Sequence, residues 1–180
     1  PEISRVAVDI DSDIIREGLA RDFPQVIYLE RPAHLRAGSI PMNEILMHDT
    51  AQLPSDLYLQ THSTNPLIKA ETFSRAIQTL LAVYPAQDSL FGVTRLQARL
   101  WDSLVRPINH NPAILLRTQD LPPVFMENSC MYLFNRETLA QRRNRLGERP
   151  LMFEIEPGEA WDIDEESTFR IVEQLMSPKG

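Results

Sequence analysis

The sequence has little cysteine and no long apolar run. Cys130 is the single cysteine among 180 residues, which excludes an intramolecular disulfide and a cysteine-rich zinc cluster and fits a reducing, cytoplasmic compartment. No apolar stretch approaches the roughly 18 residues of a membrane span. Lys and Arg (18) are outnumbered by Asp and Glu (25), giving a net charge of −7. This charge is atypical of a general nucleic-acid-binding protein, so we expect neither nucleic acid nor a membrane as a partner.

Glycine is also scarce. The six glycines are isolated, and no two are in Gly-x-Gly spacing, the spacing of loops that bind phosphates through backbone N–H groups. The Gly-x-Ser-x-Gly pattern of serine hydrolases and the His-Glu-x-x-His pattern of zinc proteases are absent too. Proline, by contrast, occurs 14 times.

The periodicity of apolar residues predicts alternating strands and helices in the first half. The clearest helix spans residues 71–84, where apolar side chains recur at i, i+3, i+4 and i+7. Strands are expected at residues 5–10, 26–29, 56–60 and 89–94. This alternation predicts an α/β sheet with right-handed crossovers. A last helix is expected at residues 165–176, with Phe169, Val172, Leu175 and Met176 facing inward.

Residues 96–134 have a different character. Extended pieces are broken by four prolines, without helical periodicity. Too many apolar side chains occur for a solvent-exposed loop: Leu100, Trp101, Ile108, Leu115 and Leu116. We predict a β-rich arm that packs against a second copy of the chain, within a single domain of residues 1–180.

The pair Asp162 and Asp164 is a candidate metal site. Alternate residues of an extended segment point to the same side, so both carboxylates can bind one cation. Carboxylate oxygens suit Mg²⁺, which usually keeps waters and shares substrate phosphates. The alternative is structural, because Asp164 can also cap the helix that follows.

Three further groups of polar residues are candidates for ligand binding. Arg117 and Gln119 are spaced to bind an acidic sugar or a phosphate, although a surface Arg117–Asp120 pair fits as well. Glu127–Tyr132 can line a polyhydroxylated ligand or form an ordinary turn. His62 lies after a predicted strand, where α/β sheets bind ligands, or in a simple surface turn. We expect Cys130 to be a small buried side chain rather than a nucleophile.

Read in order, these segments resemble the acylneuraminate cytidylyltransferases, the CMP-sialic acid synthetases. The resemblance covers almost the whole chain. It runs through Arg31-Pro32, residues 59–67, 88–93, 99–101 and 107–112, Arg117–Asp120, Glu127–Asn128 with Tyr132, and Asp162–Asp164. It implies a Rossmann-like nucleotidyltransferase sheet flanked by helices, with residues 96–134 as a dimerisation and sugar-binding arm in a homodimer or homotetramer. The implied reaction joins CTP to a nonulosonic acid such as N-acetylneuraminate, with Mg²⁺, to give the CMP-sugar and pyrophosphate.

The resemblance also implies roles for individual residues. Asp162 and Asp164 fall on the metal-binding pair, and Arg117 and Gln119 on the motif that contacts the sugar acid and the reacting phosphate. The remaining matches are substrate-binding positions: Arg31 on the nucleotide side, Asn128 and Tyr132 in the sugar pocket, and Gln60 or His62 where the family commonly has the first Gln of Gln-x-Thr-Ser-Pro.

The sequence departs from the family at its start. The family's first strand and Gly-rich phosphate loop should precede Arg5, and nothing in the sequence supplies them. We therefore expect an N-terminally truncated chain that, when isolated, shows weak or no CTP binding and no CMP-sugar synthesis, and that recovers both when the upstream strand and loop are restored. Two alternatives stay open: a cytidylyltransferase for another sugar acid (3-deoxy-octulosonate, pseudaminate or legionaminate), and a non-catalytic relic that binds a sugar or a partner.

Overall fold

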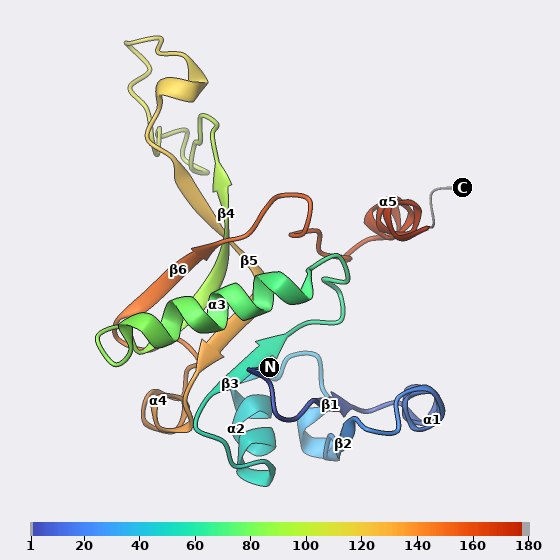
Figure 1. Cartoon of the computed structure of the whole chain (residues 1–180). Helices are drawn as coiled ribbons and strands as arrows, with labels where there is room; N and C mark the ends of the chain where they lie inside the picture. Colours follow the sequence, from blue (N-terminus) through green and yellow to red (C-terminus); the bar gives the residue numbers. More distant parts are fainter. Residues whose placement is uncertain (1, 178–180) are drawn as a thin grey trace.

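The computed structural model describes residues 2–177. In chain order the elements are β1 (Ala7–Ile10), α1 (Asp13–Asp22), β2 (Ile27–Glu30), α2 (Met42–Gln52), β3 (Tyr58–Thr61), α3 (Ala70–Val83), β4 (Ser89–Leu96), β5 (Val124–Phe134), α4 (Arg136–Arg142), β6 (Pro150–Glu154) and α5 (Glu166–Met176) (Figure 1). Short 3-10 helices lie at Ala33–Leu35 and Thr118–Asp120. The strand and helix order predicted from periodicity is therefore observed, with boundaries shifted by a few residues.

The main sheet has four strands in the order β3-β5-β4-β6. β4 and β6 are parallel, whereas β5 is antiparallel to both β3 and β4. β5 runs back because the chain leaves the sheet at the end of β4, forms a projection and returns (Figure 1). β1 and β2 form a separate parallel pair. The predicted sheet flanked by helices is thus confirmed, but its strands are mixed in direction.

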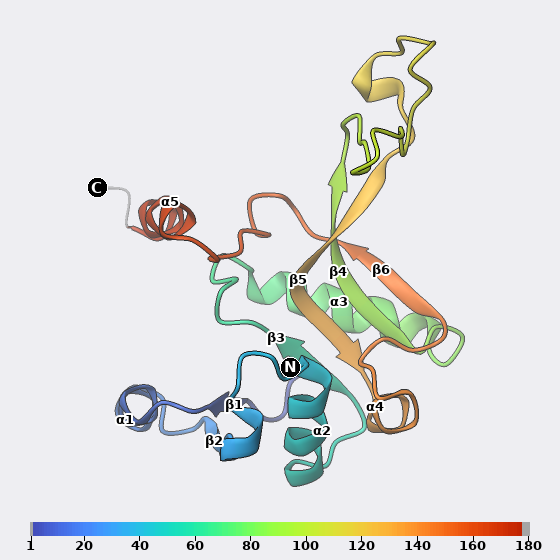
Figure 2. The same ribbon diagram turned by 180° about the vertical axis from the view of Figure 1, so that it is seen from behind.

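Helices cover both faces of the main sheet (Figure 2). Alternate side chains of a strand point to opposite faces, and β5 follows this rule: Met131 and Leu133 pack in the cluster beneath α3, while Tyr132 and Phe134 pack toward α2 and α4. The α3 cluster contains Ala76, Ile77, Leu80, Leu90, Cys130, Met131, Leu133 and Ile155. The other cluster contains Leu46, Tyr132, Phe134 and Leu139.

Residues 97–123, called the arm below, project away from the sheet (Figures 1 and 2). Within the arm the pairing is limited to one isolated bridge, between Trp101 and Pro107. Its exposed apolar side chains are Trp101, Leu104, Val105, Ile108, Ile114, Leu115 and Leu116. The expected insertion of residues 96–134 is therefore shorter than its sequence pattern indicates. Its last part, Val124–Phe134, is the central strand β5, whose C-terminal half is buried.

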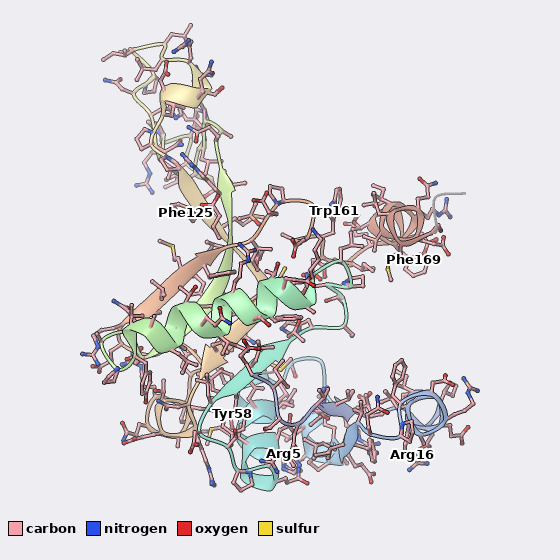
Figure 3. All side chains as sticks on the ribbon, in the orientation of Figure 1. Arg5, Arg16, Tyr58, Phe125, Trp161 and Phe169 are labelled. Carbon is pink, nitrogen blue, oxygen red and sulfur yellow. The ribbon has the colours of Figure 1, made fainter. Side chains whose placement is uncertain are left out.

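Helix α5 differs from expectation in its packing. Val172 is buried, as predicted, but Phe169, Leu175 and Met176 are exposed (Figure 3 labels Phe169). Within residues 2–177, little packs against this helix face, which leaves its amphipathic pattern only partly covered. None of the helices described is both long and apolar enough to cross a membrane.

Candidate functional site

The segment that carries Asp162 and Asp164 is attached to the turn after β3. The backbone N–H of Ile163 donates to the carbonyl of Thr64 at 2.9 Å. The side-chain amide of Asn65, itself buried, donates to the carbonyl of Trp161 at 3.2 Å. These bonds hold the segment extended, so it presents its aspartates at a fixed place.

Glu159 anchors the same segment to helix α3. Its carboxylate accepts from the Thr72 hydroxyl at 2.7 Å and from the backbone N–H of Lys69 at 3.1 Å. The ammonium of Lys69 lies 3.2 Å from the other carboxylate oxygen. Burial raises the pKa of Glu159, but the hydrogen bonds from Thr72 and Lys69 outweigh it, so the net pKa lies below its ordinary value. Glu159 is thus an ionised cap for the first turn of α3.

Asp162 and Asp164 lie in the wall of one pocket of about 220 Å³. The pocket is lined by Met126, Glu127, Asn128, Ser129, Ala160, Asp162 and Asp164. Oδ1 of Asp162 is buried and has no hydrogen-bond partner among the described residues, and a buried polar atom of this kind normally has one. No cluster of three or more His, Cys, Asp or Glu side chains suited to a metal occurs within residues 2–177. Two carboxylates beside an open pocket fit a Mg²⁺ ion that completes its shell with water and phosphate oxygens.

A bulge in β5 shapes the opposite wall of the pocket. Phe91 pairs with Tyr132 and Val93 with Glu127, so residues 128–131 face the single residue Gly92. A Cβ on Gly92 would lie 2.7 Å from the amide oxygen of Asn128, so only glycine fits this position.

The bulge contains Ser129, whose φ of 56° lies in the left-handed region. Beside it, the Asn128 amide donates to the Thr94 hydroxyl at 3.1 Å and accepts from the backbone N–H of Cys130 at 3.2 Å. Asn128 therefore lies in the pocket wall, and its amide is used to hold the bulge.

Gln60 and His62 lie on the adjoining edge of the sheet. Their Nε2 atoms are 2.8 Å apart. Because the amide nitrogen can only donate, His62 accepts at Nε2 and is neutral, with its proton on Nδ1. Burial and then the Arg145 cation lower the pKa of His62, while the Asp162 carboxylate acts in the opposite direction. His62 is thus linked to Arg145 through Gln60.

Arg145 contacts both Gln60 and Tyr132. Its Nη1 donates to Oε1 of Gln60 at 2.6 Å, and its guanidinium carbon lies 3.4 Å from the centroid of the Tyr132 ring. The Tyr132 hydroxyl donates to the Glu127 carboxylate. Burial and this hydrogen bond raise the pKa of Tyr132, so the phenol remains protonated. Gln60, His62, Arg145, Tyr132 and Glu127 form a continuous polar network beside the aspartate pocket.

Arg117 and Gln119 are not part of this group. Both lie on the 3-10 helix region of the arm, and the Arg117 side chain is 72% exposed. Nε and Nη2 of Arg117 lie 2.7 Å and 3.0 Å from the two carboxylate oxygens of Asp120. Within one chain, Arg117 therefore lies on the arm and not in the pocket wall that contains Asp162 and Asp164.

Arg31 also lies outside the pocket wall. Its Nε donates to Oδ2 of Asp9 at 2.9 Å, across the β1–β2 pair. Oδ1 of Asp9 and Oδ1 of Asp49 are buried near it without partners among the described residues.

Cys130 is fully buried in the α3 cluster. Burial, with the nearby Asp162 and Glu159 carboxylates, raises the pKa of its thiol to about 11. The expectation that Cys130 is a buried side chain is confirmed, and its thiol is not activated as a nucleophile.

Arg145 is the main residue of the site that sequence reasoning missed. It follows Arg142 and Arg143 in a short basic run, which is usually a solvated surface. Nothing in the spacing distinguishes it from its neighbours, which pair with Glu148 and Glu44 at the surface. Only the folded structure shows that Arg145, unlike Arg142 and Arg143, stacks on Tyr132 instead of pairing with a surface carboxylate.

Comparison with known proteins yields one family and several relatives. The family model described as cytidylyltransferase matches residues 1–176. The post-translational flagellin modification protein B of Campylobacter coli is 24% identical over 190 residues, covering 97% of this chain and 78% of that protein.

Solved structures share the fold at low sequence identity. The 4-diphosphocytidyl-2C-methyl-D-erythritol synthase of Anaerococcus prevotii superposes with a TM-score of 0.68 at 14% identity, covering 97% of this chain and 80% of that one. A CMP:2-keto-3-deoxy-manno-octonic acid synthetase complexed with CTP superposes with a TM-score of 0.66 at 13% identity, covering 97% and 81%.

Proposed function

The chain belongs to the cytidylyltransferase family, and from this premise we propose that it transfers the cytidylyl group of CTP to a sugar acid of the nonulosonic type, giving a CMP-sugar and pyrophosphate. The sugar's anomeric hydroxyl attacks the α-phosphorus of CTP. The new oxygen–phosphorus bond forms as the bond to the pyrophosphate oxygen breaks, and the hydroxyl proton passes to a base or to solvent. Reactions of this kind depend on positioning and on neutralising phosphate charge.

The observation that carries this proposal is the aspartate pair. Asp162 and Asp164 lie in one pocket wall, and Oδ1 of Asp162 is buried without a partner among residues 2–177. These two carboxylates would hold Mg²⁺, which when bound neutralises charge on the triphosphate and the leaving group. The chain orients the pair through the Ile163–Thr64 bond, so the carboxylates need no reorganisation when the nucleotide arrives.

The acceptor side of the pocket is suited to a polyhydroxylated molecule. Glu127 and Ser129 line the pocket and provide a carboxylate and a hydroxyl for sugar hydroxyl groups. The Tyr132 hydroxyl donates a hydrogen bond to the Glu127 carboxylate and so orients it. One of the similar proteins supports a sugar-acid substrate by name, because it is a synthetase for a CMP-linked octonic acid.

We also propose that the arm packs against a second copy, in a homodimer or homotetramer. The exposed apolar side chains of residues 97–123 support this assembly. Arg117 and Gln119, which one chain holds away from its own aspartates, would then approach the sugar acid and the reacting phosphate in the site of another copy. Arg31 would remain on the nucleotide side.

The test is pyrophosphate release from the chain with Mg²⁺, using CTP and one acceptor at a time. The acceptors are N-acetylneuraminate, 3-deoxy-octulosonate, pseudaminate and legionaminate, and ATP, GTP and UTP serve as nucleotide controls. Because the family's Gly-rich phosphate loop is expected before Arg5, the assay is run on the chain with and without this loop supplied. With the loop we expect release with CTP and at least one acid, together with the mass of the CMP-sugar. Turnover of 3-deoxy-octulosonate alone would make the chain a cytidylyltransferase for that eight-carbon acid. Binding of an acid without release by any pair would instead support a non-catalytic binding protein.

A further inference from the structure

Arg145 is fixed in place by contacts with three different elements. Its backbone N–H donates to the side-chain oxygen of Asn43 on α2 at 3.1 Å. Its guanidinium donates to Gln60 on β3 at 2.6 Å and stacks on Tyr132 of β5, 3.4 Å from the ring centroid. A long flexible side chain held in this way has lost its conformational freedom before any ligand binds, which favours recognition of a rigid, planar group.

The Arg145 charge has no carboxylate within ion-pair distance among the described residues. The ion pairs of residues 2–177 include its neighbours Arg142 and Arg143, but not Arg145. The nearby Glu127 carboxylate accepts from the Tyr132 hydroxyl instead. Arg145 is half-buried, and a cation removed from water without a counter-charge is costly. An anion supplied by a ligand would remove that cost.

The position of Arg145 indicates which part of a ligand it meets. The Tyr132 hydroxyl contacts Glu127 and lies 3.4 Å from the Ser129 hydroxyl, and both of these residues line the aspartate pocket. Gln60 joins Arg145 to His62, because its Oε1 accepts from Arg145 at 2.6 Å and its Nε2 lies 2.8 Å from Nε2 of His62. A ligand that extends along Glu127 from the aspartates therefore has one end near a metal-binding pair and the other near a cation.

We propose that Arg145 binds the carboxylate of the sugar acid and makes the site specific for acidic sugars. This inference rests on the proposed function, because it assigns the phosphates of CTP to the aspartate pair and the acid group to Arg145. A guanidinium offers five N–H donors in a planar fork that matches a carboxylate. The one hydrogen bond to Gln60 leaves an edge of that fork for the ligand. Gln60, bonded to both Arg145 and His62, is the positioning residue.

The test compares an acid with its neutral ester. Steady-state kinetics are measured for Arg145→Met, with N-acetylneuraminate or 3-deoxy-octulosonate and with the methyl ester of each. We expect the wild type to prefer the acid strongly. In the variant, the KM for the acid should rise about 100-fold, as expected on loss of a charge-assisted hydrogen-bonding pair. The KM for CTP should change by less than about twofold, and the preference for acid over ester should disappear.

Arg142→Met is the matched control, because Arg142 is a surface arginine paired with Glu148. It should behave as the wild type does. If Arg145→Met keeps the full preference for the acid over the ester, the inference is wrong. A rise in the KM for CTP with the KM for the acid unchanged would also overturn it, and would place the triphosphate at Arg145.

A calorimetric titration separates this inference from the proposed function. The same acids and esters are titrated into the wild type and Arg145→Met, with CTP present and Mg²⁺ omitted. If no acid is turned over by the wild type, the proposed function fails. The inference still stands in that case if the acid binds the wild type about 100-fold more tightly than it binds the variant. A wild type that binds none of the acids, or binds acid and ester equally, overturns the inference. Circular dichroism of the variant confirms that it is folded.

Discussion

The backbone N–H of Ile163 lies 2.9 Å from the carbonyl oxygen of Thr64. This bond joins the segment before α5 to the turn after β3, two regions almost a hundred residues apart. It places Asp162 and Asp164, on either side of Ile163, in the wall of the same pocket. The first prediction concerns these two aspartates.

Asp162→Asn should lower kcat by about 100-fold or more, because the amide cannot supply the charge that holds a divalent cation beside the phosphates. The thermal stability of the fold should not decrease. Removing the charge of a half-buried carboxylate whose Oδ1 is buried without a partner among the described residues should leave Tm equal or higher. Pyrophosphate release against Mg²⁺ concentration and thermal melts measure the two effects. Asp56→Asn, at an exposed position, is the control, and near-normal kcat in Asp162→Asn would contradict the metal assignment.

A second prediction concerns the arm. Leu115, 88% exposed at the arm, should lie in an interface between two copies, so Leu115→Glu should shift the protein from dimer to monomer by placing charge in an apolar contact. Sedimentation velocity at tens of micromolar measures the change. Ile14→Glu, at an equally exposed apolar position (83%) on α1, should leave the assembly intact. A wild type that is monomeric at this concentration would refute the proposed interface.

Arg117→Lys tests the arm's role in the reaction. Lysine keeps the charge but loses the planar fork, so we expect kcat/KM to fall at least about tenfold while the dimer persists. The structure alone predicts no such loss, because Arg117 is exposed and paired with Asp120. Arg106→Lys is the control, since Arg106 makes a similar exposed pair with Asp102 on the same arm. Equal kcat/KM values for the wild type and Arg117→Lys would leave Arg117 as a surface residue.

Titration of the Asp49 carboxyl should lower the free energy of unfolding as the pH rises. Burial and the Asp9 carboxylate raise its pKa to about 7, against the opposing effect of Arg31. The folded chain thus holds this proton more tightly than the unfolded chain does. Its stabilising contribution is complete below about pH 4 and is lost as the pH rises to about 7.

Asp49→Asn should therefore melt at a higher temperature than the wild type at pH 8 and at a similar temperature at pH 4. Thermal melts across this range, with Asp56→Asn as the control, measure the difference. A difference in Tm that does not depend on pH would show that Asp49 does not titrate in this way.

Ser129→Gly should stabilise the protein. A side chain with φ of 56° carries a conformational cost of about 1 kcal/mol that glycine avoids. Urea unfolding should show a free energy of unfolding higher by about that amount. Ser167→Gly, in the first turn of α5, should have the opposite sign, because glycine lowers helix propensity. A loss of stability in Ser129→Gly would mean that the hydroxyl contributes more than the backbone cost.

The spacing of residues within a single segment predicted the features of the fold that depend on that segment alone. The apolar stripe of residues 71–84 is the buried face of α3, with Ala76, Ile77 and Leu80 in the core. The spacing of Asp162 and Asp164 likewise put both carboxylates on one side of an extended segment, as observed. These predictions succeeded because helix and strand periods decide which side chains share a face.

The features that sequence did not predict depend on contacts between distant segments. The pattern of residues 96–134 predicted extended structure in an arm, but not that Val124–Phe134 runs antiparallel inside the main sheet. The apolar residues of α5 recur on one face of the helix, but this periodicity did not predict that Phe169 is exposed. The stacking of Arg145 on Tyr132 joins a loop to a strand, and no spacing rule links the two.

The double attachment of the segment from Glu159 to Ile163 has a kinetic consequence. At one end, the Glu159 carboxylate accepts from the backbone N–H of Lys69, just before α3, and at the other end Ile163 donates to Thr64. Opening the segment therefore breaks bonds on two different elements together, so the amide protons of Lys69 and Ile163 should exchange with solvent in a single correlated event. The aspartates would then spend most of their time already arranged for a cation, so rearrangement of the loop would not limit the rate at which the ion binds.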